Sequence, residues 1–239
     1  MLLSTTPLAD VNKFDLLNVV YVEPLLRLSL FERLEIFESH SDAAELSASI
    51  GHSDATDAQT KPLRFETQDY GELQVFGAHL NFESRSQEIT EPLAALFAWK
   101  EMPWPQRLTI LSELHNLRKR YEDFNWIGIY RRMPGTEDLV VSCYIGEPTE
   151  HIRIPVSNGI CGAAIRENKS LNIENVRADP RFIACSIKTR SELVVPIRNQ
   201  AGEAIAEIDI DSNKLAAFSP DKVAAVEALA SKLSKLNWN

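Results

Sequence analysis

The sequence predicts an α+β fold for residues 96–239, in which helices pack on a central antiparallel sheet, together with a smaller N-terminal α/β region at residues 1–95. Two observations predict it. Helix-period apolar patterns begin and end the C-terminal region, and strand-like runs paired around turn residues lie between them. Strands joined by tight turns are typical of antiparallel sheets, which need helices or a second sheet to cover their apolar faces.

The two flanking helices have clear patterns. Over residues 105–121, leucines recur every three residues from Leu108 to Leu117 among charged neighbours, which predicts an amphipathic helix that packs on a sheet. The last helix is expected to follow Ser219, a favoured N-cap residue, with Pro220 at its first position and apolar residues along one face.

Two hairpins are expected between these helices. The Pro-Gly turn at 134–135 joins the first pair of strands, and Asn199 to Gly202 joins the second pair. A short helix with cap-competent residues before it is expected at 160–165. The predicted strands are residues 126–130, 139–144, 171–173, 191–197 and 204–210.

The first 95 residues are less regular, and their polar segment at 40–61 is typical of a surface loop. Residues 61–65, 71–76 and 89–99 repeat the order of the second hairpin and the last helix. A degraded partial copy of the C-terminal domain would explain this order. Any hairpin followed by a helix would also produce it, so both interpretations stay open.

Composition excludes several classes of protein. The 239 residues carry a net charge of −9 and a pI near 5.1, which disfavours nucleic acid and anionic membrane surfaces as partners. The N-terminal residues lack the basic and apolar regions of a secretion signal, and no apolar run is long enough to span a membrane. We therefore expect a cytoplasmic protein.

Three cysteines, Cys143, Cys161 and Cys185, match no disulfide scaffold. They are either inert core residues or reactive thiols. Cys143 lies in a predicted strand, where cysteine serves as a small core residue. Cys161 lies in the first turn of the short helix, where the helix dipole favours a thiolate, and Cys185 lies in an irregular loop of the kind that borders pockets.

Carboxylates alternate with isoleucines at the end of the second hairpin. The two-residue period places Glu207, Asp209 and Asp211 on one face of a strand, and Glu192 begins the neighbouring strand. A solvated face would explain the pattern. If the strand is central, however, the charges repel unless a cation or ammonium group lies among them, and crowding raises the pKa of one carboxyl enough to make it a proton donor. The cluster then suits a small zwitterionic ligand.

Several motifs, in order and at matching intervals, make residues 125–212 resemble the free methionine-(R)-sulfoxide reductase family of GAF-type proteins. They are Asn125 to Tyr130, Arg153-Ile154-Pro155, Gly159-Ile160-Cys161-Gly162, Ile183-Ala184-Cys185, Ser191-Glu192 and Ile208 to Ser212. The resemblance implies a GAF-like sheet with Cys185 as the catalytic nucleophile and Cys161 as an auxiliary cysteine. It implies that the substrate is bound by Trp126, Tyr130, Glu192, Asp209 and Asp211.

The resemblance also implies a mechanism. Cys185 would attack the sulfoxide sulfur while a carboxylic acid protonates the leaving oxygen, and a second thiol would resolve the resulting sulfenic acid. The family's resolving position is occupied here by His151, so Cys161, Cys143 or an external thioredoxin-type reductant would have to serve. His151 is a loop residue, a ligand contact or a base that lowers a thiol pKa. Ser186 also replaces the family's usual aspartate after the catalytic cysteine.

No cofactor is expected, because the sequence lacks a phosphate-binding loop and a dinucleotide motif. No metal site is predicted either, because the five histidines show no paired ligand spacing with the cysteines. Three functions remain: a thiol-dependent reductase, a GAF-type sensor that binds a small ligand such as an amino acid without efficient turnover, and an interaction protein whose terminal helices form a homodimer.

Overall fold

The computed structural model describes residues 16–22, 31–40, 43–51, 54–56, 58–79, 82–183 and 186–238. These residues fall into two compact units, which divide the chain into Met1–Lys100 and Glu101–Asn239. Cys185 lies outside the described residues.

The second unit contains a six-stranded antiparallel sheet in the order β7-β6-β5-β10-β9-β8. The central position predicted for residues 204–210 is confirmed, since β10 lies between β5 and β9. The elements of this unit are α5 (Trp104–Arg120), β5 (Trp126–Arg132), β6 (Asp138–Ile145), β7 (Arg153–Pro155), α6 (Gly159–Glu167), β8 (Leu171–Ile173), the 3₁₀ turn η3 (Val176–Ala178), β9 (Ser191–Arg198), β10 (Ala204–Ser212) and α7 (Pro220–Leu233).

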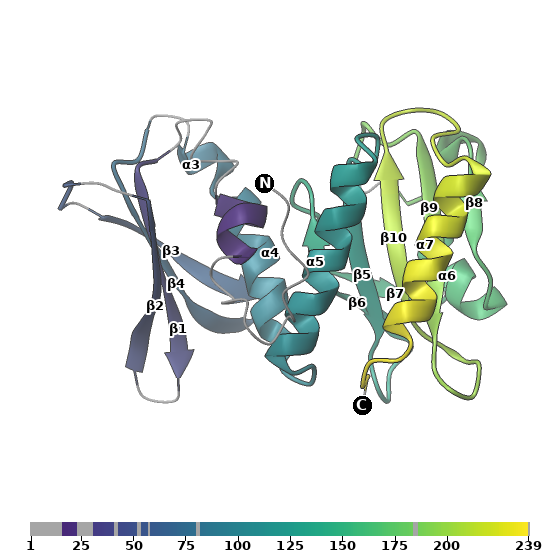
Figure 1. Cartoon of the computed structure of the whole chain (residues 1–239), viewed down its shortest axis with the longest axis horizontal. Helices are drawn as coiled ribbons and strands as arrows, with labels where there is room; N and C mark the ends of the chain where they lie inside the picture. The colour runs from purple at the N-terminus through teal and green to yellow at the C-terminus, as the bar shows by residue number, and fades with distance from the viewer. Residues whose placement is uncertain are drawn as a thin grey trace. The chain divides into compact units, whose positions relative to one another are not determined.

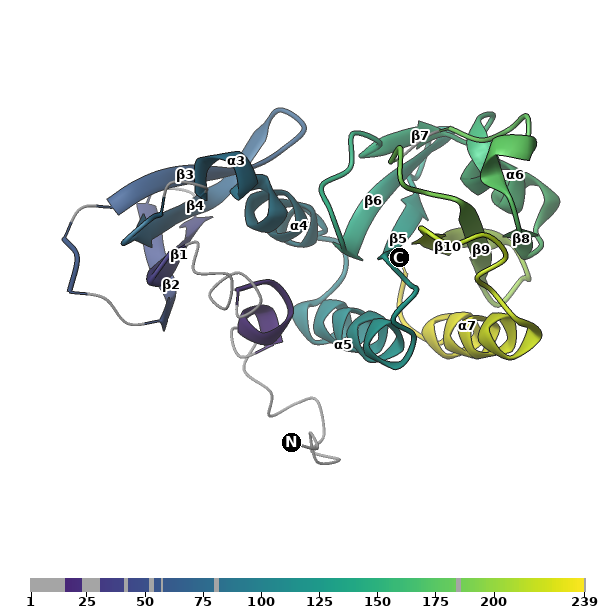
Figure 2. The same ribbon diagram turned by 90° about the horizontal axis from the view of Figure 1, so that it is seen from above.

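Helices cover both faces of this sheet. The helices α5 and α7 lie side by side on one face, and the short helix α6 lies on the other (Figures 1 and 2). Ile208 and Ile210 are fully buried and point to the face that α5 and α7 cover. Each contributes roughly 1.5–3 kcal/mol through burial of its side chain. The alternate residues of β10 therefore point toward α6.

The helices and hairpins of this unit follow the sequence pattern. The buried leucines of α5 are those of the three-residue repeat, from Leu108 to Leu114. Ser219 has the extended backbone of an N-cap and Pro220 occupies the first helical position, as predicted, although the Ser219 side chain makes no capping hydrogen bond. The strand β7 and the turn η3 were not predicted. The strand β7 has one isoleucine between Arg153 and Pro155, whereas the equally short β8 was predicted from its alternating Leu171-Asn172-Ile173.

The first unit contains a four-stranded antiparallel sheet in the order β2-β1-β4-β3, and α4 packs on β3 and β4. The prediction of a surface loop at 40–61 is wrong, because most of that segment forms β2 and β3. These strands contain few β-branched residues, so pairing with β1 and β4, rather than local propensity, sets their conformation. The elements are η2 (Asn18–Val22), β1 (Arg33–His40), β2 (Ala43–Gly51), β3 (Ala58–Phe65), β4 (Gln68–Phe76), α3 (Phe82–Arg85) and α4 (Gln87–Ala98).

The two sheets share a pairing order. The order β2-β1-β4-β3 in the first unit has the same chain connections as β6-β5-β10-β9 in the second, and in each unit the helix after the last strand packs on its sheet. This is the correspondence that a degraded repeat would leave, and the repeat itself stays a prediction.

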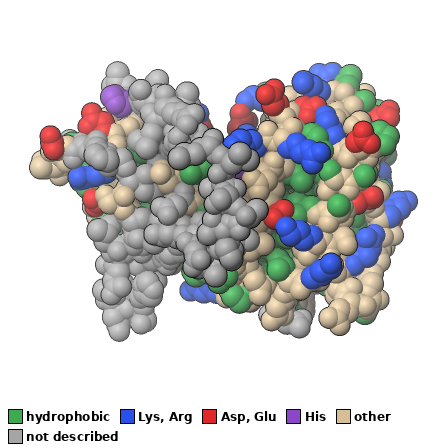
Figure 3. Space-filling view, viewed as in Figure 1, with side chains coloured by type: hydrophobic (Ala, Val, Ile, Leu, Met, Phe, Trp, Pro, Cys, Tyr) green, Lys and Arg blue, Asp and Glu red, His purple; other side chains and the backbone are tan. Residues whose placement is uncertain are grey.

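The outer surface of α5 and α7 carries charged side chains of both signs with apolar ones between them (Figure 3). Lys232 of α7 pairs with Glu113 of α5 at 2.7 Å. This mixture is typical of a solvent-facing surface rather than of an obligate dimer interface. Within the described part of the chain, none of the helices combines the length and hydropathy of a membrane span.

Candidate functional site

A cluster of four buried carboxyl groups lies on the face of the sheet toward α6. Glu207 is fully buried, and Glu192, Asp209 and Asp211 are each less than a tenth exposed. Asp211 lies directly opposite Glu192 in the ladder between β10 and β9, so side chains from both strands share one face. The alternative of a solvated acidic face is therefore wrong.

Strand β5 places aromatic side chains beside this cluster. Trp126 is paired with Asp211, and Tyr130 is paired with Glu207. Paired residues of an antiparallel ladder point to the same face, so the aromatic residues line the same side of the sheet as the carboxyls. Between these two pairs, Gly128 is the partner of Asp209 and contributes no side chain of its own beside that carboxyl.

Trp126 lies flat over two glycines. A Cβ atom at Gly128 or at Gly146 would overlap the indole, so both positions need glycine for the ring to lie there. The ring stacks on Tyr144 with centroids 5.3 Å apart, and its Nε1 donates to the carbonyl of Glu147 at 3.2 Å. These contacts fix one orientation of the indole beside the acidic cluster.

Tyr130 is anchored by His151, at the position where the resemblance implies a resolving cysteine. The Tyr130 hydroxyl donates to the main-chain carbonyl of His151 at 2.8 Å. The backbone N–H of His151 in turn donates to the Thr149 hydroxyl at 3.1 Å. The main chain of His151 therefore positions Tyr130, whatever its imidazole does.

Burial raises the pKa of all four carboxyl groups. The pKa of Asp209 rises to about 7, and those of Glu192, Glu207 and Asp211 rise well above their usual values. Desolvation is the largest cause of the rise for each group. Repulsion from neighbouring carboxylates raises the pKa of Glu192, Glu207 and Asp211 further. A hydrogen bond from Thr189 offsets part of the rise for Asp211. At neutral pH the cluster therefore holds protons that it can donate.

Cys161 lies at the edge of this cluster. It is buried in the first turn of α6, and its thiol donates to Glu192 Oε1 at 3.9 Å. The proximity of this thiol lowers the pKa of Glu207 and Asp209 and so opposes part of the effect of burial. The predicted helix places this cysteine against three of the four carboxyls.

Cys143 occupies a different environment. It is fully buried in β6 and paired with Ile129, which in turn pairs with Ile208. This register places Cys143 on the face of the sheet that α5 and α7 cover, away from the carboxyls. The structure therefore does not bring Cys143 to the acidic cluster.

A cavity of about 190 Å³ lies beside Asp211 and is also lined by Trp126, Thr189 and Ser186. Its size suits a small metabolite, because pockets for drug-sized ligands are larger, about 300–1,000 Å³. Ser186 immediately follows Cys185 in the chain. One member of the acidic cluster, Asp211, thus meets the indole and the segment after the candidate nucleophile around one opening.

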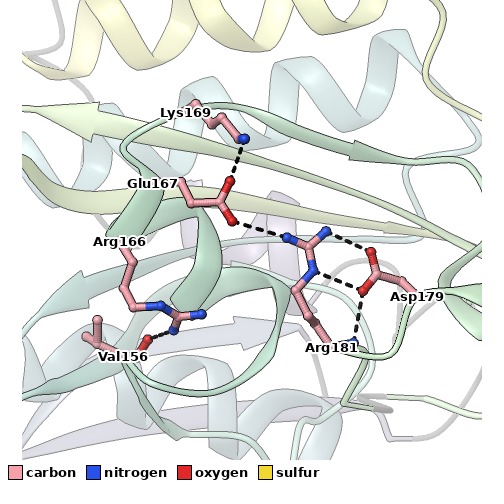
Figure 4. A network of polar contacts seen from close by, with 6 residues as sticks. All are labelled: Val156, Arg166, Glu167, Lys169, Asp179 and Arg181. Atoms are coloured by element: carbon pink, nitrogen blue, oxygen red, sulfur yellow. Dashed lines mark hydrogen bonds and ion pairs between the residues drawn. The ribbon is translucent and has the colours of Figure 1, made fainter.

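The segment before Cys185 is held by an ion-pair network (Figure 4). Arg181 donates to Asp179 from Nε at 2.9 Å and from Nη2 at 2.7 Å, and its Nη1 reaches Glu167 of α6 at 3.4 Å. These contacts hold the pKa of Asp179 below its usual value and raise that of Arg181. Lys169 pairs with the other oxygen of Glu167 at 2.5 Å. Arg181, four residues before Cys185, therefore links this segment to α6 through Glu167.

Comparisons with known proteins agree with this fold. Residues 108–235 match the GAF domain model, which covers more than half of the chain. The chain therefore belongs to the GAF domain family. Within that family it is similar to proteins named free methionine-R-sulfoxide reductase, as follows.

The Escherichia coli protein of that name is 34% identical over 122 residues, which are 50% of this chain and 70% of the relative. The solved structure of the type II free methionine-R-sulfoxide reductase from Thermoplasma acidophilum is 35% identical in sequence to this chain and superposes with a TM-score of 0.52. The match covers 54% of this chain and 89% of that one. A putative GAF sensor protein from Burkholderia vietnamiensis is 27% identical, with a TM-score of 0.51, and covers 64% of this chain and 94% of its own.

The structure brings most of the predicted site residues together. Trp126, Tyr130, Cys161 and the carboxyls of β9 and β10 share one face of the sheet, while Cys143 lies on the other face. Sequence reasoning missed Tyr144 and Thr189. The pairing of Tyr144 with Gly128 could have been anticipated from the hairpin register, but no sequence pattern marks Thr189.

Proposed function

We propose that this protein reduces free methionine-(R)-sulfoxide to methionine, with Cys185 as the nucleophile. The observation that carries the proposal is the buried row of carboxyls beside the aromatic side chains of Trp126 and Tyr130. A single free amino acid supplies both complementary parts, an ammonium group for the carboxyls and a methyl sulfoxide for the aromatic rings.

Glu192, Asp209 and Asp211 bind the ammonium group in this proposal. Buried carboxyls without a counter-ion destabilise the fold, so a ligand that brings a positive charge into the cluster gains favourable interaction there. Trp126 and Tyr130 contact the methyl group and orient the sulfur. A methionine sulfoxide within a peptide chain has no free ammonium group, which is why we propose the free amino acid as substrate.

The reaction transfers one oxygen atom. The Cys185 thiolate attacks the sulfoxide sulfur, the S–O bond breaks as the oxygen passes to the cysteine, and methionine and a Cys185 sulfenic acid are formed. The protonated carboxyl that assists the leaving oxygen is one of Glu192, Asp209 and Asp211, because burial lets these groups hold protons near neutral pH. A second thiol then condenses with the sulfenic acid to give a disulfide and water.

His151 cannot form that disulfide, so the second thiol comes from elsewhere. We propose an external dithiol of the thioredoxin type, with Cys161 as the intramolecular alternative. Cys161 is buried against Glu192, so it would have to leave this contact to react.

The test is consumption of reductant by the purified full chain with free methionine-(R)-sulfoxide. Reduced thioredoxin and dithiothreitol serve as separate reductants, and Cys185→Ser serves as the control. The proposal predicts methionine formation with at least one reductant and none above background in Cys185→Ser. No difference between the two proteins with either reductant would refute it.

A second candidate function is a sensor that binds an amino acid without turnover. His151 at the resolving position, the additional N-terminal unit and the similarity to a putative GAF sensor protein favour it. It predicts that methionine raises the melting temperature of the wild-type chain and of Asp221→Asn, an exposed control in α7, but not of Asp209→Asn. A ligand-induced shift retained in Asp209→Asn would contradict the assigned site.

A further inference from the structure

Glu207 is a fully buried carboxyl that the proposed reaction does not use. Neither of its side-chain oxygens has a hydrogen-bond partner of normal geometry among the described residues, and the same holds for Asp209 Oδ1. An unpaired buried carboxyl destabilises a fold by a large amount unless it is protonated or meets a cation. Glu207 shares one face of β10 with Asp209, whose neighbours include the Cys161 thiol, and these groups indicate which cation would suit it.

The neighbouring groups form a compact donor set. One ligand atom each from Cys161, Glu192 and Asp209 lie within 4.8 Å of one another, and Glu207 lies two residues before Asp209 on the same face of β10. Cys161 Sγ lies 3.9 Å from Glu192 Oε1. In a tetrahedral zinc site, bonds of about 2.3 Å to sulfur and 2.0 Å to oxygen place these two atoms about 3.5 Å apart. This pair therefore needs only a small side-chain rotation, while Glu207, outside the 4.8 Å group, joins it by rotating its side chain.

We propose that Cys161, Glu192, Glu207 and Asp209 bind a divalent metal ion of intermediate softness, with Zn²⁺ as the best-matched ion. Three protein elements supply the ligands: α6, β9 and β10. No zinc site was predicted from the sequence, because its histidines lack paired ligand spacing. Histidine spacing says nothing about a site whose ligands are carboxylates and one cysteine.

The ligand types select the metal. A thiolate ligand disfavours Mg²⁺ and Ca²⁺, which take oxygen ligands, whereas Zn²⁺ and Co²⁺ accept sulfur and carboxylate oxygen together. The ion can enter beside Asp211, which lies two residues further along β10 and lines the open cavity. A bound ion would occupy the carboxyls Glu192 and Asp209, so it would exclude a ligand that needs them for its ammonium group.

Metal binding is measured without any amino acid present. Its outcome is therefore independent of the test of the proposed function, and either claim can fail while the other holds. The tag-free full chain carrying Cys185→Ser, which removes a competing thiol, is dialysed against buffered Zn²⁺ and the bound metal is counted. We expect one Zn²⁺ per chain. Binding of Co²⁺ should produce a thiolate-to-metal charge-transfer absorption that is lost in Cys161→Ser.

Matched variants locate the site. In the same background, Cys161→Ser and Glu207→Gln should each weaken Zn²⁺ binding at least about tenfold, because loss of a direct ligand costs no less than loss of a supporting contact. Glu203→Gln, at an exposed position in the same hairpin, should bind as the parent does. Failure to bind stoichiometric Zn²⁺, or equal affinity in the parent, Cys161→Ser and Glu207→Gln, would overturn the proposal.

Thermal melting separates loss of ligation from loss of fold. Zn²⁺ should raise the melting temperature of the parent and of Glu203→Gln but not that of Glu207→Leu. Without metal, Glu207→Leu should melt at or above the parent, because an apolar side chain replaces an unpaired buried carboxyl. A Zn²⁺-induced shift of parental size in Glu207→Leu would refute the assignment.

Discussion

Glu192 and Asp211 lie directly opposite each other on β9 and β10, so two buried carboxyl groups form one cross-strand pair of the six-stranded sheet. Like charges in this arrangement destabilise the sheet unless a proton or a cation separates them. A proton or a bound cation would therefore stabilise this site. Its stability and its ligand affinity should both depend on pH.

The stability of the unliganded protein should fall as pH rises, relative to a variant without one of these carboxyls. Asp209 has a pKa of about 7 in the fold but about 3.8 when unfolded, so between these values the folded state holds a proton that the unfolded chain has released. The wild type should therefore lose up to about 1.4 kcal/mol per pH unit relative to Asp209→Asn. Urea unfolding at pH 5 and pH 8 measures this, with Asp221→Asn as control. A gain in Asp209→Asn that is the same at both pH values would contradict the raised pKa.

Amino-acid binding should become tighter as pH rises through 7. The ligand's ammonium pairs with ionised carboxyls, and below its pKa Asp209 must release a proton before it can pair. Loss of one proton on binding weakens the affinity by up to tenfold for each pH unit below the pKa. Isothermal titration with methionine at pH 6, 7 and 8 would show this trend. Equal affinity at all three values would mean that no carboxyl ionises on binding.

Gly128→Ala should weaken ligand binding and lower stability by about 1–3 kcal/mol through overpacking. The added methyl group overlaps the Trp126 indole and the Tyr144 Cβ, so it displaces the indole from its place over the strand. A double-mutant cycle checks the cause, because Gly128→Ala should weaken binding far less in a Trp126→Ala chain. An equal loss of affinity in both backgrounds would show that the indole is not the affected group.

Arg181→Gln should slow turnover several-fold without changing substrate affinity. The substitution removes the ion pairs to Asp179 and Glu167 that fasten the segment before Cys185, and such partly exposed pairs contribute less than about 1 kcal/mol to overall stability. Lys169→Gln is the matched control, since it removes a different partner of Glu167. An unchanged kcat in Arg181→Gln would show that this network does not position the nucleophile.

Residue patterns alone predicted the second unit well and the first unit poorly. The α5 leucines and the Ser219-Pro220 start of α7 are local features that survive in the fold. The strand β2 carries no comparable pattern, because its conformation depends on pairing with β1. Likewise, alternation placed Asp209 and Asp211 on one face, but only the sheet order decides whether that face is buried.

The most direct test of the central claim is a single turnover without any reductant. The fully reduced chain is mixed with excess free methionine-(R)-sulfoxide, and methionine released per chain is quantified together with the oxidation state of Cys185 by mass spectrometry. We predict about one methionine per chain, from the single oxygen transfer to one thiolate, with oxidation at Cys185 and no methionine from Cys185→Ser. Release of no methionine by the wild type, or an equal amount by Cys185→Ser, would contradict the account.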